Sequence, residues 1–330
     1  MRHIVVTGGE GFIGSNFIRY VLGNSDDEIV NVDLRTYAGQ GDNLRDIREI
    51  PELKNRYHLI HGNVGERKLM RHILSPKDIV VHFAAESHVD RSLKDGAAEY
   101  FMENNAEATR RLLECCVEKE VAKFIHISTD EVYGQLELYG KRKFVESDPL
   151  EPRNPYSVSK ARAEEIVKTF FDKLPISITR SSNNYGPWQY PEKFIPLAVT
   201  NFIDGKCMGV YGDGQNIRDW IHVMDNCEGI FRVIENGRPS EVYNIGGGNE
   251  INNLELAIKL AGIIGRDPNV NIKPIEDRKD HDLRYALDCS KIKNEVGWEP
   301  RIDFKEGLKK TVEWYCTNSP WWKPLKEWKK

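Results

Sequence analysis

The sequence predicts an α/β protein built on a doubly wound parallel sheet, with a smaller mixed α/β domain beside it. Three observations predict this fold class. Short β-branched runs alternate with amphipathic helical stretches through the first half of the chain, a glycine-rich turn joins the first strand to the first helix, and the alternation becomes irregular after Arg180. Strands that alternate with helices in this way indicate βαβ units, and right-handed crossovers wind such units into a doubly wound sheet.

Each expected strand is a short apolar run, and each expected helix carries apolar residues at helical spacing. The strands are expected at 4–6, 29–32, 57–60, 79–81, 123–127 and 176–178. The helices between them are expected at 13–22, 66–74, 105–119 and 157–171. A helix at 223–235 and a strand at 241–245 are expected to return to this sheet, and a helix at 254–264 is expected outside it. Residues 1–180, with the return segment at about 219–247, therefore form the first predicted domain, and the remaining segments of 181–330 form the second.

Length and charge limit the class of protein. A chain of 330 residues is too long for one ordinary core, and 40% hydrophobic with 30% charged residues describes a globular chain. The net charge of −4 means that the chain lacks the overall positive charge typical of nucleic-acid-binding proteins. The longest apolar stretch, 79–85, is far shorter than the roughly 20 residues of a membrane helix, and Met1 is not followed by the apolar block of a signal peptide. We therefore expect a cytoplasmic protein that binds neither nucleic acid nor membrane.

The six cysteines and nine histidines show no spacing typical of a metal or disulfide site. No Cys-x-x-Cys pair occurs, and the adjacent Cys115 and Cys116 fall in a helical pattern. We expect reduced, structural cysteines and no metal. The segment from Trp314 to Lys330 is rich in Trp and Lys, and it is expected to form a packed aromatic terminus with a solvated basic end.

The glycine-rich turn is the first candidate ligand site. Gly8, Gly11 and Gly14 follow a strand and open a helix, a spacing that lets a pyrophosphate approach the backbone and be held by free N–H groups of the helix N-terminus. Asp33 ends the second strand 19 residues after Gly14, near the offset of an acid that binds a ribose 2′-OH and repels a 2′-phosphate. The pattern predicts a Rossmann-type domain that binds NAD rather than NADP, although Asp33 as a surface turn cap is an alternative. Glu10 opposes the ligand charge, so it is expected to point away.

A tyrosine and a lysine on one helix face form the second candidate site. Tyr156 and Lys160 are spaced i and i+4. A free phenol titrates near about 10, so a phenolic base near neutrality needs a pKa lower by roughly 3. The Lys160 ammonium and a nicotinamide cation are expected to lower it. A packed tyrosine beside a solvated lysine is the alternative.

These two sites together resemble the extended short-chain dehydrogenase/reductase superfamily. Four further segments, which are 84–92, 128–134, 182–187 and 217–220, are similar to motifs of one branch, the nucleotide-sugar 4,6-dehydratases, and the resemblance covers essentially the whole chain. Epimerases of the same superfamily lack an acidic pair after the threonine that corresponds to Thr129. The pair Asp130 and Glu131 therefore favours the dehydratase branch.

The resemblance implies a role for each reacting group. Tyr156, assisted by Thr129, takes the proton of a sugar 4-OH while hydride passes from C4 to NAD. Glu131 then removes the C5 proton as general base, Asp130 protonates the departing 6-OH as general acid, and hydride returns to C6. The residues alone give two neighbouring carboxylates, and two solvated acids after a strand are the alternative. Opposed roles require different pKa values.

The resemblance also assigns the binding residues. For the cofactor NAD they are Gly8, Gly11, Phe12, Ile13, Gly14, Asp33, Leu34, Arg35, Thr36, Asn63, Val64, Phe83, Ala84, Ala85, Glu86, Asn104, Tyr156, Lys160 and Asn184. For the substrate they are Ser87, Thr129, Asn183, Lys193, Phe194, Arg218, Asn253 and His281.

Three of these assignments carry a qualification from the sequence. Arg218 is the expected bidentate partner of a phosphate, with an ion pair to Asp219 as the alternative. Asn63 stands where the family usually has Asp. Residues 277–281 read Asp-Arg-Lys-Asp-His where the family usually has Asp-Arg-Pro-Gly-His. Because the resemblance places this segment beside the nucleotide site, the change affects the expected base and sugar preference more than the expected type of reaction.

The resemblance implies an NAD-dependent dehydration of dTDP-glucose to dTDP-4-keto-6-deoxyglucose by a homodimer. One alternative is the same reaction on UDP-glucose or a UDP-amino sugar. Another is a nucleotide-sugar 4-epimerase, which the pair Asp130 and Glu131 opposes. A third is a non-catalytic NAD-sensing protein, which would be expected to lack the acids, Tyr156 or Lys160.

Overall fold

The structure, a computed structural model, describes residues 1–39, 42–278 and 281–327. Its largest element is a seven-stranded sheet in the order β10-β6-β5-β4-β1-β2-β3, with every neighbouring pair parallel. The strands are β1 (His3–Thr7), β2 (Glu28–Asp33), β3 (Tyr57–His61), β4 (Ile79–His82), β5 (Lys123–Thr129), β6 (Ile176–Ser181) and β10 (Glu241–Ile245). The doubly wound fold class is confirmed.

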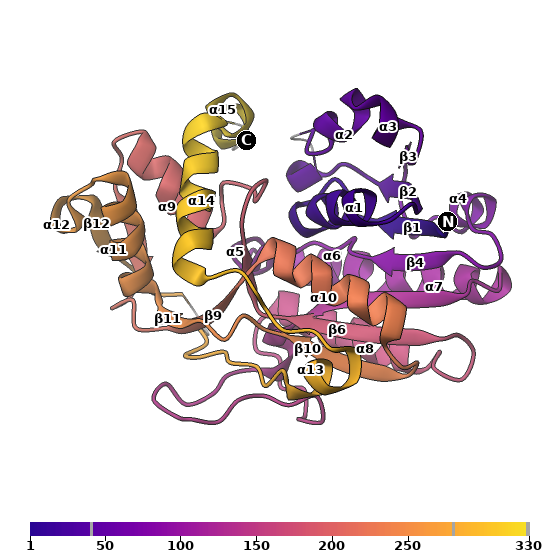
Figure 1. Cartoon of the computed structure of the whole chain (residues 1–330). Helices are drawn as coiled ribbons and strands as arrows, with labels where there is room; N and C mark the ends of the chain where they lie inside the picture. The colour runs from indigo at the N-terminus through magenta and orange to yellow at the C-terminus, as the bar shows by residue number, and fades with distance from the viewer. Residues whose placement is uncertain (40–41, 279–280, 328–330) are drawn as a thin grey trace.

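Both faces of this sheet are buried, which explains why its strands are short, almost continuous apolar runs. Along β1, Ile4 and Val6 belong to one core and Val5 to the other. The helices α1 (Phe12–Asn24), α10 (Val223–Asn236) and α13 (Ser290–Val296) cover the first face, and α4 (Arg67–Ile73), α7 (Ala108–Glu118) and α8 (Pro155–Lys168) cover the second (Figure 1). Short helices complete this part of the chain: α2 (Arg45–Glu49), α3 (Pro51–Lys54), α5 (Val89–Ser92) and α6 (Ala97–Met102).

The chain returns to the large sheet after leaving it. Strand β10 pairs with β6, with Tyr243 opposite Thr179, and α10 packs against α1. The expected return of a helix and a strand is therefore confirmed, whereas the division into two domains stays a prediction.

The smaller part of the molecule has its own sheets and core. Its strands are β7 (Asn183–Tyr185), β8 (Met208–Tyr211), β9 (Ile217–His222), β11 (Glu250–Asn252) and β12 (Ile272–Ile275). They form a mixed sheet, β11-β9-β7, and a parallel pair, β12-β8. The helices are α9 (Phe194–Ile203), α11 (Asn253–Ile264), α12 (Pro268–Asn271), α14 (Phe304–Thr317) and α15 (Ser319–Glu327).

Two expected helices have different limits in the structure. Helix α8 begins at Pro155, before the expected start at 157, because Asn154 caps it by accepting a hydrogen bond from the Ser157 N–H at 2.9 Å. The helix expected over 105–119 is divided, since a π-helical turn over Glu103–Glu107 precedes α7. In that turn Asn105 donates to the Glu86 carbonyl and to the Ser159 hydroxyl, each at 2.9 Å. The turn therefore anchors the chain that follows β4 to helix α8.

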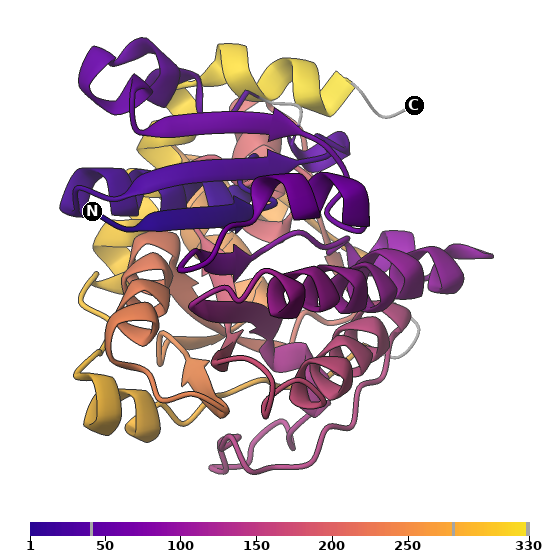
Figure 2. The same cartoon turned by 90° about the vertical axis from the view of Figure 1, so that its right-hand side faces the viewer.

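The aromatic residues near the C-terminus pack together as expected. Trp322 is fully buried, and Trp314 lies 4.9 Å from Tyr315 and 5.2 Å from Trp321 between ring centroids. Figures 1 and 2 place α15 near the segment that contains α2 and α3. The expected basic end, residues 328–330, lies outside the described residues. Among the described helices none is long and apolar enough to cross a membrane.

The strand order fixes where a ligand can bind. Strand β1 has β2 on one side and β4 on the other. From β2 the chain continues to β3, away from β1, and from β4 it continues to β5 in the opposite direction. In open α/β sheets the ligand crevice lies outside the carboxyl ends of the strands at this reversal. Asp33 and Thr129 are the last residues of β2 and β5, and the glycine turn and the segment after His82 follow the ends of β1 and β4.

Candidate active site

Two adjoining cavities lie along the carboxyl ends of the strands. The first is lined by the glycine turn, the ends of β2, β4 and β5, and helix α8, and the second extends toward the smaller part of the molecule. Both are lined by Glu131, Asn183, Asn184, Gln189, Glu192 and Lys193. The two cavities therefore meet beside the acidic residue that follows β5.

The predicted cofactor residues, with one exception, line the first cavity. Those present are Gly8, Gly11, Phe12, Ile13, Gly14, Asp33, Leu34, Thr36, Asn63, Val64, Phe83, Ala84, Ala85, Glu86, Asn104, Tyr156, Lys160 and Asn184. The exception is Arg35, which is not among the residues that line either cavity. Its backbone, at φ 51°, turns back so that its N–H donates to Asp33 Oδ1 at 2.6 Å. Arg35 as a cofactor-binding residue stays a prediction.

The glycine turn is shaped to let a ligand approach the backbone. Gly8 has φ +74°, and a Cβ there would lie 2.5 Å from the Ala84 nitrogen. A Cβ on Gly14 would lie 2.4 Å from the Gly8 carbonyl oxygen. Gly11 precedes α1 without a side-chain cap, so the first N–H groups of the helix are available to a phosphate. These residues fit a dinucleotide pyrophosphate.

The two acids near this turn have different surroundings. Asp33 lines the cavity, is buried, and accepts the Glu10 N–H at 2.9 Å in addition to that of Arg35. Burial raises the pKa of Asp33, and these backbone donors oppose the rise. The Glu10 carboxyl accepts a hydrogen bond from the Tyr57 hydroxyl at 3.1 Å and faces Arg48. Glu10 does not line the cavity, as we expected from its charge.

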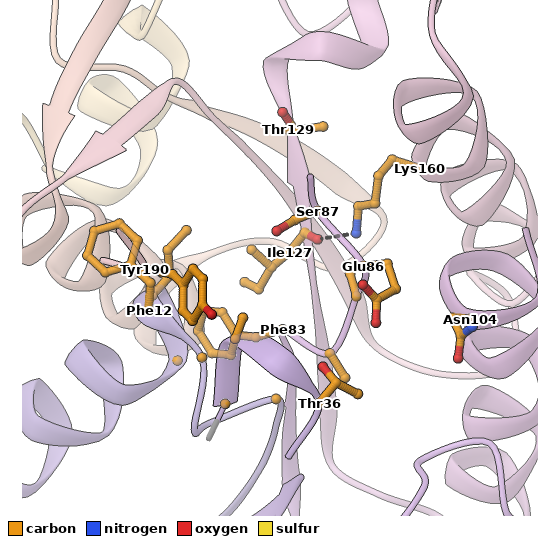
Figure 3. Close-up of a pocket in the computed structure, with 18 of the residues that line it drawn as sticks. Phe12, Thr36, Phe83, Glu86, Ser87, Asn104, Ile127, Thr129, Lys160 and Tyr190 are labelled. Atoms are coloured by element: carbon orange, nitrogen blue, oxygen red, sulfur yellow. Dashed lines mark hydrogen bonds between the residues drawn. The ribbon is translucent and has the colours of Figure 1, made fainter. Parts of the chain in front are cut away.

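The reacting groups lie on one strand end and one helix. Thr129 ends β5, and its hydroxyl accepts the Glu131 N–H at 3.3 Å at the start of the 3-10 turn Asp130–Tyr133. Tyr156 and Lys160 come from α8, and all five predicted catalytic residues line the first cavity. Lys160 Nζ donates to the Ile127 carbonyl at 2.7 Å (Figure 3). Asn154 donates to Glu131 Oε2 at 3.3 Å, so the cap of α8 also orients this acid.

The environment of Tyr156 differs from our expectation. Burial raises its pKa, and the charges of Glu131 and Asp130 raise it further, while a hydrogen bond with Thr129 opposes them. Burial lowers the pKa of Lys160 to about 8. The protein groups that surround Tyr156 therefore raise its pKa, since the phenol shares its cavity with two carboxyls. The decrease expected from Lys160 together with a nicotinamide cation stays a prediction.

The two acids have different tendencies to hold a proton. Burial raises the pKa of Asp130 well above its usual range, and the charges of Glu131 and Asp219 add to the effect. Burial also raises the pKa of Glu131, but the Lys193 ammonium and the Asn154 amide oppose the rise. Within the described part of the chain, Asp130 Oδ2 has no hydrogen-bond partner. The surroundings of Asp130 therefore favour its protonated form, while Lys193 and Asn154 favour the charged form of Glu131.

The predicted substrate residues fall in both cavities. Ser87 and Thr129 line the first, Phe194, Arg218, Asn253 and His281 line the second, and Asn183 and Lys193 line both. Arg218 lies over the Tyr285 ring at 4.4 Å and donates to the Asp282 carbonyl at 2.9 Å. Among the described residues Arg218 donates to backbone carbonyls and forms no ion pair with Asp219, which accepts the Asn249 N–H, so the alternative of a structural Arg–Asp pair is not supported. The substituted residues Lys279 and Asp280 lie outside the described residues.

Several cavity residues were not predicted from the sequence. Besides Ser182 and Tyr37, the first cavity is lined by Gln189, Tyr190 and Glu192, and the second by His88, Asn154, Tyr211, Trp220, Arg278, Asp282 and Tyr285. Gln189 and Tyr190 belong to the irregular segment 181–191, and Arg278 belongs to the segment that departs from the family motif. The unusual composition of these two segments could have indicated that they line the site. Tyr37 and Tyr285 stand in no recognisable pattern. In residues 1–39, 42–278 and 281–327, no group of three or more His, Cys, Asp or Glu side chains could hold a metal ion.

Comparisons with known proteins agree on the family. A family profile described as GDP-mannose 4,6 dehydratase matches residues 5–311. A dTDP-glucose 4,6-dehydratase of Streptomyces niveus is 43% identical over 98% of this chain and 95% of its own. The chain belongs to the dTDP-glucose 4,6-dehydratase family. A further relative, the low-salt glycan biosynthesis protein Agl12 of Haloferax volcanii, is 45% identical over 94% of this chain and 98% of its own.

Solved structures of the dTDP-glucose 4,6-dehydratase family share this fold. The crystal structure of DesIV, a dTDP-glucose 4,6-dehydratase from Streptomyces venezuelae with NAD and TYD bound, has a TM-score of 0.93 and 44% identity. The match covers 98% of this chain and 99% of that one. The predicted family and the Rossmann-type fold are confirmed.

Proposed function

We propose that this protein is an NAD-dependent dTDP-glucose 4,6-dehydratase, a hydro-lyase that forms dTDP-4-keto-6-deoxyglucose. The observation that carries the proposal is the position of Asp130, Glu131, Tyr156 and Lys160 along one cavity that also contains the glycine turn. Membership of the dTDP-glucose 4,6-dehydratase family supports it. The acidic pair argues against a simple 4-epimerase, and the presence of all four groups argues against a non-catalytic sensor.

The cofactor supplies reversible hydride transfer when it is bound, as NAD is in the structure of the related DesIV. Gly8, Gly11 and Gly14 hold its pyrophosphate against the helix N-terminus, and Asp33 binds the adenosine ribose. The side chain of Lys160 is fixed by the Ile127 carbonyl, so it holds its charge at a defined place beside the nicotinamide site. Asn63 and Val64 lie where the adenine is expected.

The protein groups then move protons in sequence. Tyr156 accepts the proton of the sugar 4-OH as C4 is oxidised to a ketone, and this ketone makes the C5 proton acidic. Glu131 removes that proton, and the electron pair of the C5–H bond forms the C5–C6 double bond. Asp130 protonates the departing 6-OH, which leaves as water. When C6 is reduced, Glu131 returns a proton to C5.

The second cavity provides groups for the nucleotide diphosphate. Arg218 and Lys193 bring positive charge to it, and Phe194 and Asn253 line it. Lys193 Nζ is anchored on the Ser87 carbonyl at 2.7 Å, so the first and second cavities are connected through one cation. A nucleotide diphosphate bound in the second cavity would place its sugar near Glu131, where the two cavities meet.

The proposal is tested with a panel of nucleotide sugars and mass spectrometry. Incubation with dTDP-glucose is expected to yield a product lighter by one water. UDP-glucose, a UDP-amino sugar and GDP-mannose are the comparison substrates, because residues 279–280 depart from the family motif and the matching profile is described by GDP-mannose. An isomer without loss of water would indicate an epimerase, and no product from any sugar would contradict the dehydratase.

Solvent hydrogen is expected to enter the product at one carbon. When the reaction runs in heavy water, the product should carry deuterium at C5, because Glu131 exchanges its proton with solvent before returning it. NMR of the purified product locates the label. A product with only protium at C5 would exclude the elimination and reprotonation scheme.

Replacing Arg218 with alanine is expected to raise KM for the nucleotide sugar by about ten- to a hundredfold, the effect of losing charged hydrogen bonds to a phosphate. The value of kcat should change little, because Arg218 contacts neither C4, C5 nor C6 in the proposed complex. Steady-state kinetics measure both constants. An unaltered KM would assign Arg218 to the structural contact with Tyr285 alone.

Two finer expectations belong with this proposal. We expect a homodimer, which sedimentation velocity at several concentrations tests directly. We also expect the enzyme to act in the cytoplasm, where cell fractionation with antibody detection would place it.

A further inference from the structure

We propose that helix α15 is a clasp that retains the dinucleotide cofactor between the oxidation at C4 and the reduction at C6, with Trp321 as its positioning residue. The inference rests on the proposed function, because only a reaction that uses the cofactor twice on one substrate molecule needs such retention. If the cofactor left after the first step, the sugar would be released as a 4-ketone that still carries its 6-OH.

The first contact of the clasp joins the end of the chain to the phosphate-binding turn. Trp321 Nε1 donates to Asn43 Oδ1 at 3.1 Å, and Asn43 Nδ2 donates to the Glu10 carbonyl at 2.7 Å. Asn43 is buried. One amide therefore connects α15, at the opposite end of the sequence, to the backbone of the turn that cradles the pyrophosphate.

The second contact reaches the wall of the first cavity. The Tyr190 hydroxyl donates to the Leu325 carbonyl of α15 at 3.2 Å. Tyr190 lines the cavity (Figure 3) and packs edge-on against Tyr37, which also lines it, with ring centroids 5.4 Å apart. The Tyr190 ring is thus held from outside the cavity by the helix and from inside by a residue that follows β2.

The third contact fixes the segment that carries Tyr190. Trp188 lies 5.4 Å from Trp321 between centroids, and the Arg19 guanidinium of α1 lies over the Trp188 ring at 4.5 Å. Trp188 has φ 70°, a conformation that a bulky residue adopts only when its surroundings enforce it. Asn16 of α1 donates to the Pro187 carbonyl at 3.0 Å. The segment is therefore fixed between α15 and the helix whose N-terminus would hold the pyrophosphate.

These contacts join α15 to two parts of the cofactor cavity wall, to the phosphate-binding turn through Asn43 and to the Tyr190 segment directly. In the proposed clasp, release of the dinucleotide requires these two parts to separate. The sequence interpretation of this terminus as aromatic packing describes its core correctly, but Trp321 also reaches the first part of the chain at Asn43, and Leu325 contacts the segment that carries Tyr190.

The test measures the dissociation rate of NAD from the purified holoenzyme, by exchange against labelled NAD, in Trp321→Phe and Tyr190→Phe variants. Tyr190→Phe keeps its ring and loses one hydrogen bond, and Trp321→Phe loses the indole N–H but keeps an aromatic ring, so we expect dissociation about fivefold faster, the effect of one net hydrogen bond. With dTDP-glucose, both variants should also release some 4-ketosugar that has lost two hydrogens but no water. Wild-type dissociation rates in both variants would overturn the proposal, and Tyr190→Phe keeps the test open if Trp321→Phe does not fold.

The matched control is Trp322→Phe on the same helix. Trp322 Nε1 donates to the Tyr315 carbonyl at 2.8 Å within the smaller part of the molecule, and its side chain is fully buried. This variant should lower Tm without changing NAD dissociation. Equal loss of NAD in Trp322→Phe would assign the effect to general destabilisation and overturn the clasp. If the wild-type protein removes no water from any nucleotide sugar, the proposed function fails, whereas the NAD dissociation rates still report on the contacts themselves.

Discussion

Replacing Glu131 with glutamine is expected to lower kcat by about 10³-fold, within the range that a positioned general base contributes. Glutamine has nearly the same shape and still accepts the Asn154 hydrogen bond, but it cannot take the C5 proton. Oxidation at C4 does not need Glu131, so the near-ultraviolet absorbance of reduced cofactor should accumulate on the variant. Steady-state kinetics and stopped-flow absorbance measure the two effects.

The neighbouring acid provides the matched control for this experiment. In Asp130→Asn, exchange of C5 hydrogen with solvent should persist while loss of water slows, whereas Glu131→Gln should lose both. Both variants should bind NAD as the wild type does, because neither residue belongs to the cofactor set. Turnover of Glu131→Gln at the wild-type rate would remove this residue from the base role, and C5 exchange in it would point to another base.

Replacing Arg180 with methionine is expected to destabilise the protein by about 3–5 kcal/mol, the cost of leaving a buried charge unpaired. Arg180 and Glu164 are almost fully buried, and two hydrogen bonds of 3.0 and 2.6 Å join them. Glu164 lies on α8, one turn after Lys160, and the Arg180 guanidinium lies over the ring of Tyr133, which closes the turn that carries Asp130. Urea unfolding measures the change in the free energy of unfolding.

A double variant separates charge burial from lost packing. When Glu164 is also replaced, by leucine, no unpaired charge remains, so much of the lost stability should return. The exposed pair of Arg162 and Glu165 on the same helix is the control, since Arg162→Met should cost less than about 1 kcal/mol. A double variant as unstable as the sum of both single variants would mean that the ion pair is not the source of the effect.

Features that depend on neighbouring residues in the sequence were accessible without the structure. The glycine spacing over 8–14 predicted the turn because a pyrophosphate site needs backbone without side chains, and the contacts that a Cβ would make at Gly8 and Gly14 agree with this. The i, i+4 spacing of Tyr156 and Lys160 placed both on one face of α8. The direct succession of Asp130 and Glu131 after a strand placed both in one turn.

Features that depend on contacts between distant residues could not be predicted from the sequence. The positive φ of Arg35, 51°, and the hydrogen bond from its N–H to Asp33 are set by the turn after β2. The Tyr156 pKa depends on how deeply the phenol is buried and on two carboxyls that approach it from another element. Tyr285 and Arg278 reach the second cavity from distant parts of the chain.

The sequence by itself determined the doubly wound sheet, the dinucleotide turn and the types of reacting group, because each arises from spacing within a single strand, turn or helix. The tertiary structure decided which distant side chains meet these groups. It gave Asp130 and Glu131 different electrostatic surroundings, and it joined α15 to the cofactor turn through Asn43. Burial and charge are properties of a site assembled from several elements, so they follow from packing and not from the order of residues in any one segment.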